Sequence, residues 1–135
     1  MASILKVDAL QGVTSAGDIA VTSEGGSATQ SLQQGLCKVW INFDGTGTIS
    51  TRDSLNVSSI SDEGTGYYQY DFTNAMSNAN YSASGTGGNN DNNVNRVVQF
   101  GDGYTTTALD LNTGDGAGSP SDRSVMGSQI FGDLA

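Results

Sequence analysis

Alternation of apolar and polar residues begins at residue 39 and recurs through the rest of the chain. Val39, Ile41 and Phe43 would point to one side of a strand, whereas Trp40 and Asn42 would point to the other. The same strand character is found in residues 48–52, 54–60, 67–72, 80–85, 94–100, 104–111 and 125–134. Short strands at this spacing predict an all-β fold, an antiparallel β-sandwich of jelly-roll-like form.

Two of these segments also predict which side chains share a face. Residues 54–60 are interpreted as one strand, with Leu55 and Val57 on the same face. In the segment 67–72, the residues expected on one side are Tyr68, Tyr70 and Phe72.

Glycine-rich stretches separate the predicted strands. Residues 44–47, 63–66 and 101–103 are expected to form tight turns. Two longer stretches, 85–93 and 112–122, are predicted to be loops because glycine and asparagine tolerate positive φ and offer little to a core.

The first 27 residues form a separate segment with few large side chains. We expect residues 1–27 to be an extended N-terminal arm for attachment or subunit exchange, and residues 28–135 to be the sandwich domain. One short helix is predicted over residues 27–38, with Ser27 or Thr29 as its cap and an extended linker as the alternative. The residues of the arm expected to make assembly contacts are Ile4, Leu5, Val7, Leu10, Ile19 and Val21.

Charge and composition narrow the range of partners. The chain has 135 residues with 5 basic and 14 acidic side chains, a formal net charge of 5 − 14 = −9. Because phosphate contacts require clustered Lys and Arg, we expect neither nucleic acid nor an anionic membrane surface as a partner. The lone Cys37 is expected to be a buried apolar residue, and no apolar run approaches the roughly 20 residues of a membrane helix. With no secretory signal pattern at its start, the chain is expected to be made in a cytoplasm.

The residue types argue against most catalytic chemistry. The chain contains no histidine, so Ser-His-Asp and Cys-His catalysis and a structural zinc site are excluded. Paired carboxylates remain a formal alternative, but most of the candidate carboxylates lie in or beside expected turns; they are Asp44, Asp53, Asp62, Glu63 and Asp71. Asp110, Asn112 and Asp115 offer a weak alternative for calcium without matching a calcium-loop pattern. We therefore expect a protein that is not an enzyme and has no cofactor or metal.

The segment 38–81 resembles a module of tailed-bacteriophage virion proteins found in phages of marine and other aquatic bacteria. The shared pattern is K-x-W-x-N-F-x-G-T-G, then R-D-S-x-N-V-S-S-I, then D-x-G-T-G-x-Y-x-x-x-F-T-N-A-M and N-Y. The opening MASILKVDALQ and the ending QIFGDLA are also similar to those proteins. The matching positions are Lys38, Trp40, Asn42, Phe43, 45–47, 52–54, 56–60, Asp62, 64–66, Tyr68, 72–76 and 80–81.

This resemblance implies a non-enzymatic virion component that forms a homotrimer. The first hypothesis is a short tail fibre or fibre tip that contacts a host-surface glycan or protein. The alternative is a capsid decoration or cement protein that clamps shell subunits through the arm; a free carbohydrate-binding sandwich is a third possibility. The residues expected to contact a receptor under the first hypothesis are Tyr81, Asn89, Asn90, Asp91, Asn92, Asn93 and Tyr104.

Overall fold

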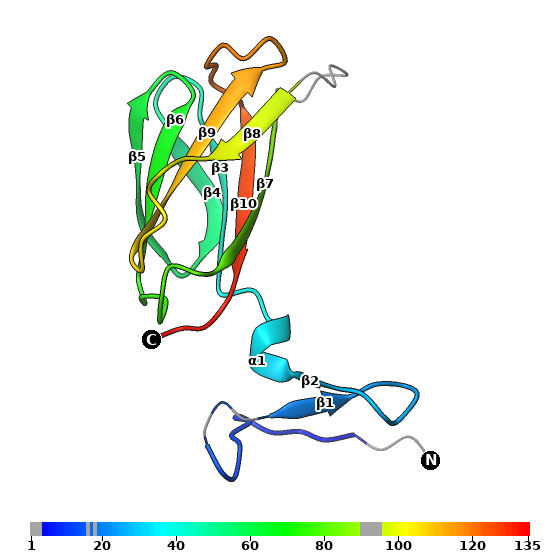
Figure 1. Ribbon diagram of the computed structural model, residues 1–135. Coiled ribbons are helices and arrows are strands. Elements are labelled where there is room, and N and C mark those ends of the chain that lie inside the picture. Colours follow the sequence, from blue (N-terminus) through cyan, green and yellow to red (C-terminus); the bar gives the residue numbers. More distant parts are fainter. Residues whose placement is uncertain (1–3, 16, 18, 90–95) are drawn as a thin grey trace. The chain divides into compact units, whose positions relative to one another are not determined.

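The computed structural model describes residues 4–15, 17, 19–89 and 96–135. The chain divides into two compact units, Met1–Leu36 and Cys37–Ala135 (Figure 1). Residues 28–36, which the sequence analysis assigned to the sandwich, thus belong to the N-terminal unit.

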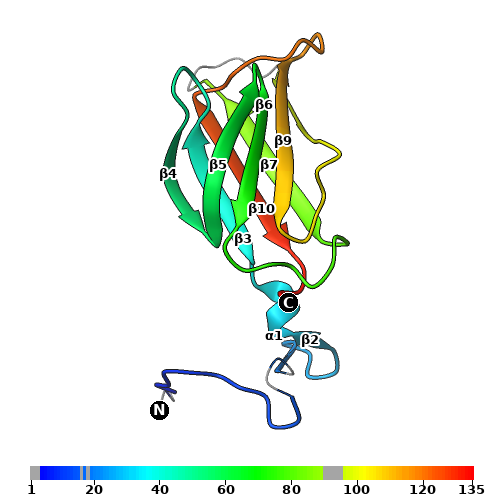
Figure 2. The ribbon, with the colours of Figure 1, turned by 90° about the vertical axis from the view of Figure 1, so that its left-hand side faces the viewer.

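The C-terminal unit is an antiparallel β-sandwich made of two four-stranded sheets, which confirms the predicted fold class. One sheet has the order β4-β3-β10-β7 and the other β5-β6-β9-β8, and Figure 2 shows the two layers one behind the other. The strands of the first sheet are β3 (Val39–Asp44), β4 (Ser50–Leu55), β7 (Ser82–Gly88) and β10 (Val125–Phe131). The strands of the second are β5 (Val57–Gly64), β6 (Tyr67–Phe72), β8 (Arg96–Phe100) and β9 (Ala108–Asp115).

Alternate residues of the strands meet between the sheets and form the core. In β3, Val39, Ile41 and Phe43 are buried, as predicted. The ring of Phe43 packs edge-on against Tyr68 of the opposite sheet, with ring centroids 5.1 Å apart. The buried apolar cluster comprises Val39, Ile41, Phe43, Tyr68, Tyr70, Phe72, Met76, Tyr81, Leu109, Leu111, Met126 and Ile130. Burial of this alternating set on both sheets is the main source of stability.

The prediction of a single strand over residues 54–60 is wrong, because the chain changes sheets at Asn56. β4 ends at Leu55 in one sheet and β5 begins at Val57 in the other. Asn56 has φ 58°, a left-handed conformation that turns the chain. Its Oδ1 accepts hydrogen bonds from Asn74 N (2.7 Å) and Nδ2 (3.0 Å), and its Nδ2 donates to Asn74 O (3.1 Å). Asparagine therefore supplies both the tolerated φ and the bonds that secure this corner.

Replacing Asn56 should separate these two contributions. Asn56→Ala is expected to lower the free energy of unfolding by about 3 kcal/mol, since it loses the hydrogen bonds and strains the backbone. Asn56→Gly loses the same bonds but adopts positive φ readily, so a loss of only about 1–2 kcal/mol is expected. Urea unfolding followed by circular dichroism measures both values. Equal losses for the two variants would contradict the role assigned to φ.

The prediction of a loop over 85–93 is wrong for its first residues, because β7 extends to Gly88. Gly85 and Gly87 lie where strand β8 of the other sheet approaches closely. A Cβ on Gly85 would lie 3.0 Å from Val98 Cγ1 and 3.2 Å from Phe100 Cζ, and one on Gly87 would lie 3.0 Å from Val98 Cγ2. The glycines leave space for side chains of the other sheet, so they act as strand residues here.

Strand β9 also lies further along the chain than predicted. It spans Ala108–Asp115, so the predicted strand begins four residues too early and the predicted loop over 112–122 starts inside the strand. Residues 104–107 form a turn in which Thr105 Oγ1 accepts hydrogen bonds from Ala108 N (2.8 Å) and Thr107 N (3.2 Å). This local side-chain bonding competes with strand pairing and delays the start of β9.

The N-terminal unit contains a hairpin and one helical turn. Strand β1 (Ala20–Thr22) pairs antiparallel with β2 (Thr29–Ser31), and α1 spans Leu32–Gly35. The helix predicted over 27–38 is therefore much shorter, because residues 29–31 use their backbone groups in the hairpin. Ser31, not Ser27 or Thr29, is the cap, with its Oγ 3.5 Å from Gln34 N. No helix in the described part of the chain combines the length and apolar character needed to cross a membrane.

Candidate functional site

Tyr81, predicted to contact a receptor, is a core residue. Its side chain is 7% exposed, and its hydroxyl donates hydrogen bonds to Thr105 O (3.1 Å) and Ala108 O (3.2 Å). Its ring stacks on Tyr104 at 5.1 Å and packs edge-on against Phe72 at 6.1 Å. Burial raises the pKa of the Tyr81 phenol to about 12. In the sequence, Tyr81 and Ala83 alternate with polar residues over the predicted strand 80–85, and this period of two was the available signal that the ring points inward, although β7 itself begins only at Ser82.

Among the described residues, the other two predicted contact residues, Tyr104 and Asn89, do not lie on one surface. Tyr104 is half-buried between Tyr81 and Phe100, and Asn89 Oδ1 accepts a hydrogen bond from Ser124 N (3.3 Å). Tyr81 and Asn89 flank opposite ends of β7, so they lie at opposite ends of the sandwich (Figure 1). The predicted contact residues Asn90, Asp91, Asn92 and Asn93 lie outside the described residues.

The predicted assembly residues expose apolar surface in the N-terminal unit. Ile4 and Leu5 are each 78% exposed, and Val7, Leu10 and Val21 are also exposed, whereas Ile19 is half-buried. A pocket of about 340 Å³ opens within this unit. Its apolar lining residues are Val7, Ala9, Leu10, Ile19, Leu32 and Leu36. The pocket brings together two segments that the sequence analysis treated separately, residues 7–10 and the helix region.

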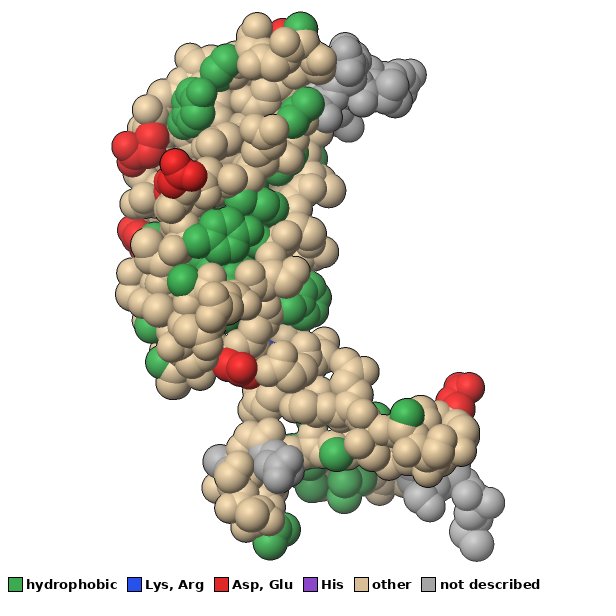
Figure 3. Space-filling view, in the orientation of Figure 1, with side chains coloured by type: hydrophobic (Ala, Val, Ile, Leu, Met, Phe, Trp, Pro, Cys, Tyr) green, Lys and Arg blue, Asp and Glu red, His purple; other side chains and the backbone are tan. Residues whose placement is uncertain are grey.

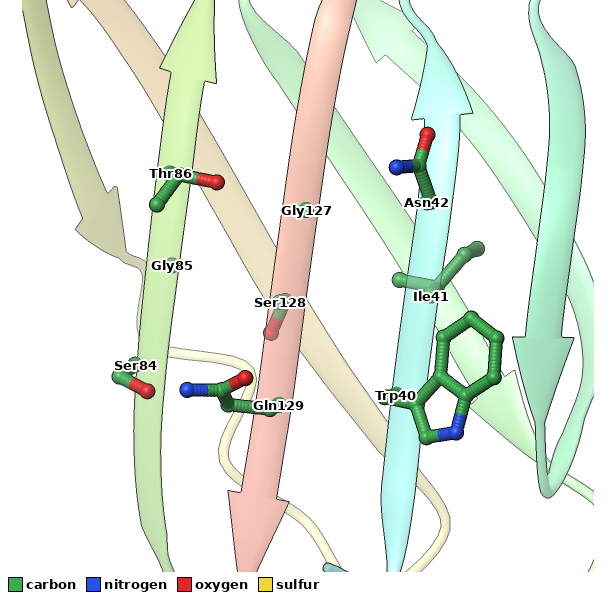
Figure 4. A pocket seen from close by; sticks show the side chains of 9 residues that line it. All are labelled: Trp40, Ile41, Asn42, Ser84, Gly85, Thr86, Gly127, Ser128 and Gln129. Carbon is green, nitrogen blue, oxygen red and sulfur yellow. The ribbon is translucent and has the colours of Figure 1, made fainter.

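A groove of about 380 Å³ crosses the outer face of the first sheet (Figure 4). We call it the sheet groove. It is lined by Trp40, Ile41, Asn42, Ser84, Gly85, Thr86, Gly127, Ser128 and Gln129. These residues come from β3, β10 and β7, three neighbouring strands that are far apart in the sequence.

Strand register places the groove residues in two adjacent rows. Trp40 pairs with Gln129, which in turn pairs with Ser84. In the next outward-facing row, Asn42 pairs with Gly127, which pairs with Thr86. Three strands at spacings of about 4.8 Å make each row about 10 Å wide.

Gly127 forms the floor of the groove because it has no side chain in the middle of the second row. A Cβ at this position would lie 3.2 Å from Thr86 Oγ1. In Figure 4, the side chains of Thr86 and Asn42 stand on the strands to either side of Gly127, and the Trp40 indole extends toward β4. Any larger residue at 127 would fill the hollow.

The sheet groove is uncharged. None of its nine lining residues is an acid or a base, so it offers neither proton transfer nor cation binding through carboxylates. It presents an indole, two amides and hydroxyl groups instead. Arg52 Nη1 lies 3.4 Å from Asn42 Oδ1, while Arg52 Nη2 pairs with Asp44 Oδ2 at 2.9 Å outside the groove. This arrangement suits binding of a neutral polar ligand rather than catalysis.

A second hollow of about 380 Å³ lies on the outer face of the other sheet. There Tyr67 of β6 pairs with Asn112 of β9, which pairs with Gln99 of β8. Tyr67 is exposed, but Asp115 and a glycine-rich turn form much of the rim. The hollow therefore differs from the sheet groove in carrying a charge.

The residues considered for calcium have other hydrogen-bonding roles. Asp110 Oδ1 accepts a hydrogen bond from Gln69 Nε2 (2.9 Å) within the second sheet. Asp115 Oδ1 accepts from Ala117 N and Ser119 N, both at 2.9 Å, and so orders the turn after β9. Among the described residues, no group of three or more His, Cys, Asp or Glu side chains could hold a metal ion.

The sequence alone indicated only some of the residues that line the sheet groove. Alternation placed Trp40 and Asn42 on the same outward face, and this signal identifies one wall. The opposite wall belongs to β7 and the floor to β10, and their pairing with β3 follows only from the fold. Comparisons with known protein families, with curated proteins and with solved structures find no match to this chain.

Proposed function

We propose that this chain is a non-enzymatic structural component of a phage virion, a short trimeric tail fibre or fibre-tip module for host attachment. The similarity of residues 38–81 to virion proteins motivates the proposal. The observation that supports it most is a difference between the two units of the chain. The sandwich unit has a complete core of its own, whereas the N-terminal unit leaves large apolar side chains exposed.

Exposed apolar side chains in the N-terminal unit supply the assembly surface. Ile4, Leu5 and Leu10 leave more than half of their surface to solvent, which is costly unless another chain covers it. Burying this surface against copies of the same chain or another virion protein yields the free energy of association. The sandwich is then free to present its outer faces.

The surface of the sandwich suits recognition of neutral or polar groups rather than nucleic acid. On the face shown in Figure 3, most of the surface is neither charged nor hydrophobic, and acidic side chains form small separate patches. A net charge of −9 also repels phosphate backbones.

A capsid decoration or cement protein is the second candidate, because the same apolar N-terminal unit could clamp shell subunits. Copy number separates the two functions. Quantitative mass spectrometry of purified particles, referenced to the major capsid protein, should give a few copies per virion for a tail fibre. A ratio near one-to-one would instead favour the cement protein, and absence from the particle would contradict both.

Introducing charge into the apolar pocket should disrupt assembly. Leu10→Asp is expected to weaken self-association at least tenfold, since a carboxylate would be desolvated in the interface. The matched control is Thr14→Asp, which adds the same charge at an exposed polar residue of the same unit outside the pocket. Light scattering after size-exclusion chromatography measures the mass at each concentration. A wild-type protein that stays monomeric at high concentration would contradict the proposed trimer.

A further inference from the structure

We propose that the sheet groove binds a neutral saccharide, with Trp40 as the stacking residue and Gly127 as the floor. This inference rests on the attachment function proposed above. It adds the class of ligand that the sandwich would bind during attachment.

The first argument is the type of side chains that converge on the groove. Apolar sugar faces pack on aromatic rings, and sugar hydroxyls both donate and accept hydrogen bonds. Trp40 supplies a ring and an N–H donor, Gln129 offers an amide with two donors and an acceptor, and Asn42 adds amide N–H donors while its Oδ1 accepts from Arg52 Nη1 (3.4 Å). Ser84 and Thr86 add hydroxyl groups from the opposite wall.

The second argument is that these polar groups are open to a ligand. Ser84, Thr86 and Gln129 are exposed at their positions on the strands. They sit on rigid paired strands, with the register Ser84↔Gln129 and Thr86↔Gly127. The backbone that carries these side chains is ordered before binding, so no backbone entropy is lost at these positions when a ligand docks.

The third argument is charge. The nine lining residues carry no charge although the chain as a whole is strongly acidic. A cationic or anionic ligand would find no partner in the groove, and an acidic sugar would also be repelled by the chain's net charge. A neutral saccharide is therefore the class of ligand that fits.

The test uses the purified full-length chain and an array of neutral oligosaccharides built from glucose, galactose, mannose and N-acetylglucosamine. Uronic acid and sialic acid glycans serve as the charged comparison set. At least one neutral glycan is expected to bind, and titration calorimetry with that glycan then gives the dissociation constant. Failure of every neutral glycan, or a preference for the acidic set, would overturn the inference.

Two variants assign the binding to the groove. Trp40→Ala removes the ring, and Gly127→Leu fills the floor while projecting to the outside; each is expected to weaken binding at least tenfold. Thr51→Ala, an exposed β4 position outside the groove, is the matched control and should bind as the wild type does. Circular dichroism and the urea midpoint verify that each variant is folded. Unchanged binding in both folded groove variants would place the site elsewhere and overturn the proposal.

The test also distinguishes this inference from the proposed virion role. If Gly127→Leu lowers the oligomer mass and no glycan binds, the groove is an interface between copies of the chain, and the saccharide proposal fails. Incorporation into particles depends on the N-terminal unit and is measured separately by copy number. The binding site can therefore be rejected while the virion function stands.

Discussion

Raising the pH above about 10 is expected to unfold the sandwich steeply. Burial raises the pKa of Tyr81 to about 12 and raises the pKa values of Tyr68 and Tyr70 well above their usual range. In Tyr68 a hydrogen bond to Asp122 Oδ1 (3.0 Å) adds to this effect, because a phenolate could not donate it. In the unfolded chain all three phenols titrate near 10.

The direction of this pH effect on stability follows from the number of protons that the folded and unfolded chains bind. Above about pH 10 the unfolded chain releases phenol protons that the folded chain retains, so ionisation favours unfolding. Each buried tyrosine then removes about 1.4 kcal/mol of stability per pH unit, until the pH reaches its folded-state pKa. The three together remove about 4 kcal/mol per unit, a large part of the 5–15 kcal/mol typical of a domain. Below the unfolded pKa this contribution is fully present.

Urea midpoints measured from neutral pH upward check this expectation. Tyr81→Phe should reduce the loss of unfolding free energy per pH unit above pH 10 by about one third, since one of the three phenols is gone. The change should cost little at neutral pH, because Ala108 O still accepts a hydrogen bond from Thr105 Oγ1 (3.2 Å). Stability that stays constant up to about pH 12 would show that these phenols are accessible to solvent.

Gly66→Ala is expected to lower the free energy of unfolding by at least about 3 kcal/mol. Gly66 has φ 74°, and a Cβ there would overlap Thr113 O and lie 2.7 Å from Ser121 N. These backbone atoms cannot move away easily. Thr113 N donates to Gly66 O at 2.7 Å, and Ser121 N donates to Thr113 O at 3.1 Å. The hairpin between β5 and β6 is thus held tightly against the turn that follows β9.

Gly47→Ala is the matched control for this effect. Gly47 has a similar φ of 61°, but no atom lies within 4 Å of the position its Cβ would take. Its replacement should cost only the backbone strain, about 1 kcal/mol. Chemical denaturation of both variants measures the difference. A Gly66→Ala loss no larger than that of Gly47→Ala would contradict the steric argument.

How far local patterns could predict the structure depends on the element. Strands β3 and β6 were predictable because alternation is a local signal and each of these strands buries one side only. The short helix was overestimated, since its first residues pair with a strand that lies seven or more positions earlier. Gly85 and Gly87 of β7 were assigned to a loop on residue type. Glycine is needed at these positions because Val98 and Phe100 of the other sheet leave no room for a larger side chain, and the sequence does not show this contact.

The candidate functional residues likewise differ in how much local signal the sequence carries for them. The apolar side chains of the arm lie in a segment too small to bury them, and most of them are exposed in the structure; their role in assembly stays a prediction. The receptor residues were chosen by type alone, and type does not distinguish Tyr81, which lies in the core, from an exposed ring. Conversely, Ser84, Thr86 and Gln129 have no distinctive local signal. They form a wall of the groove only because β7 pairs with β10.

By itself, the sequence determined the all-β class, the alternating core of the central strands, the acidic and uncharged polar character of the surface, and the lack of histidine chemistry. These properties depend on residue type and on a period of two, which are local. The tertiary structure alone decided the change of sheet at Asn56, the strand character of Gly85 and Gly87, and the assembly of the sheet groove. Each of these depends on antiparallel pairing or packing between residues distant in the chain, for which a single sequence carries no local signal.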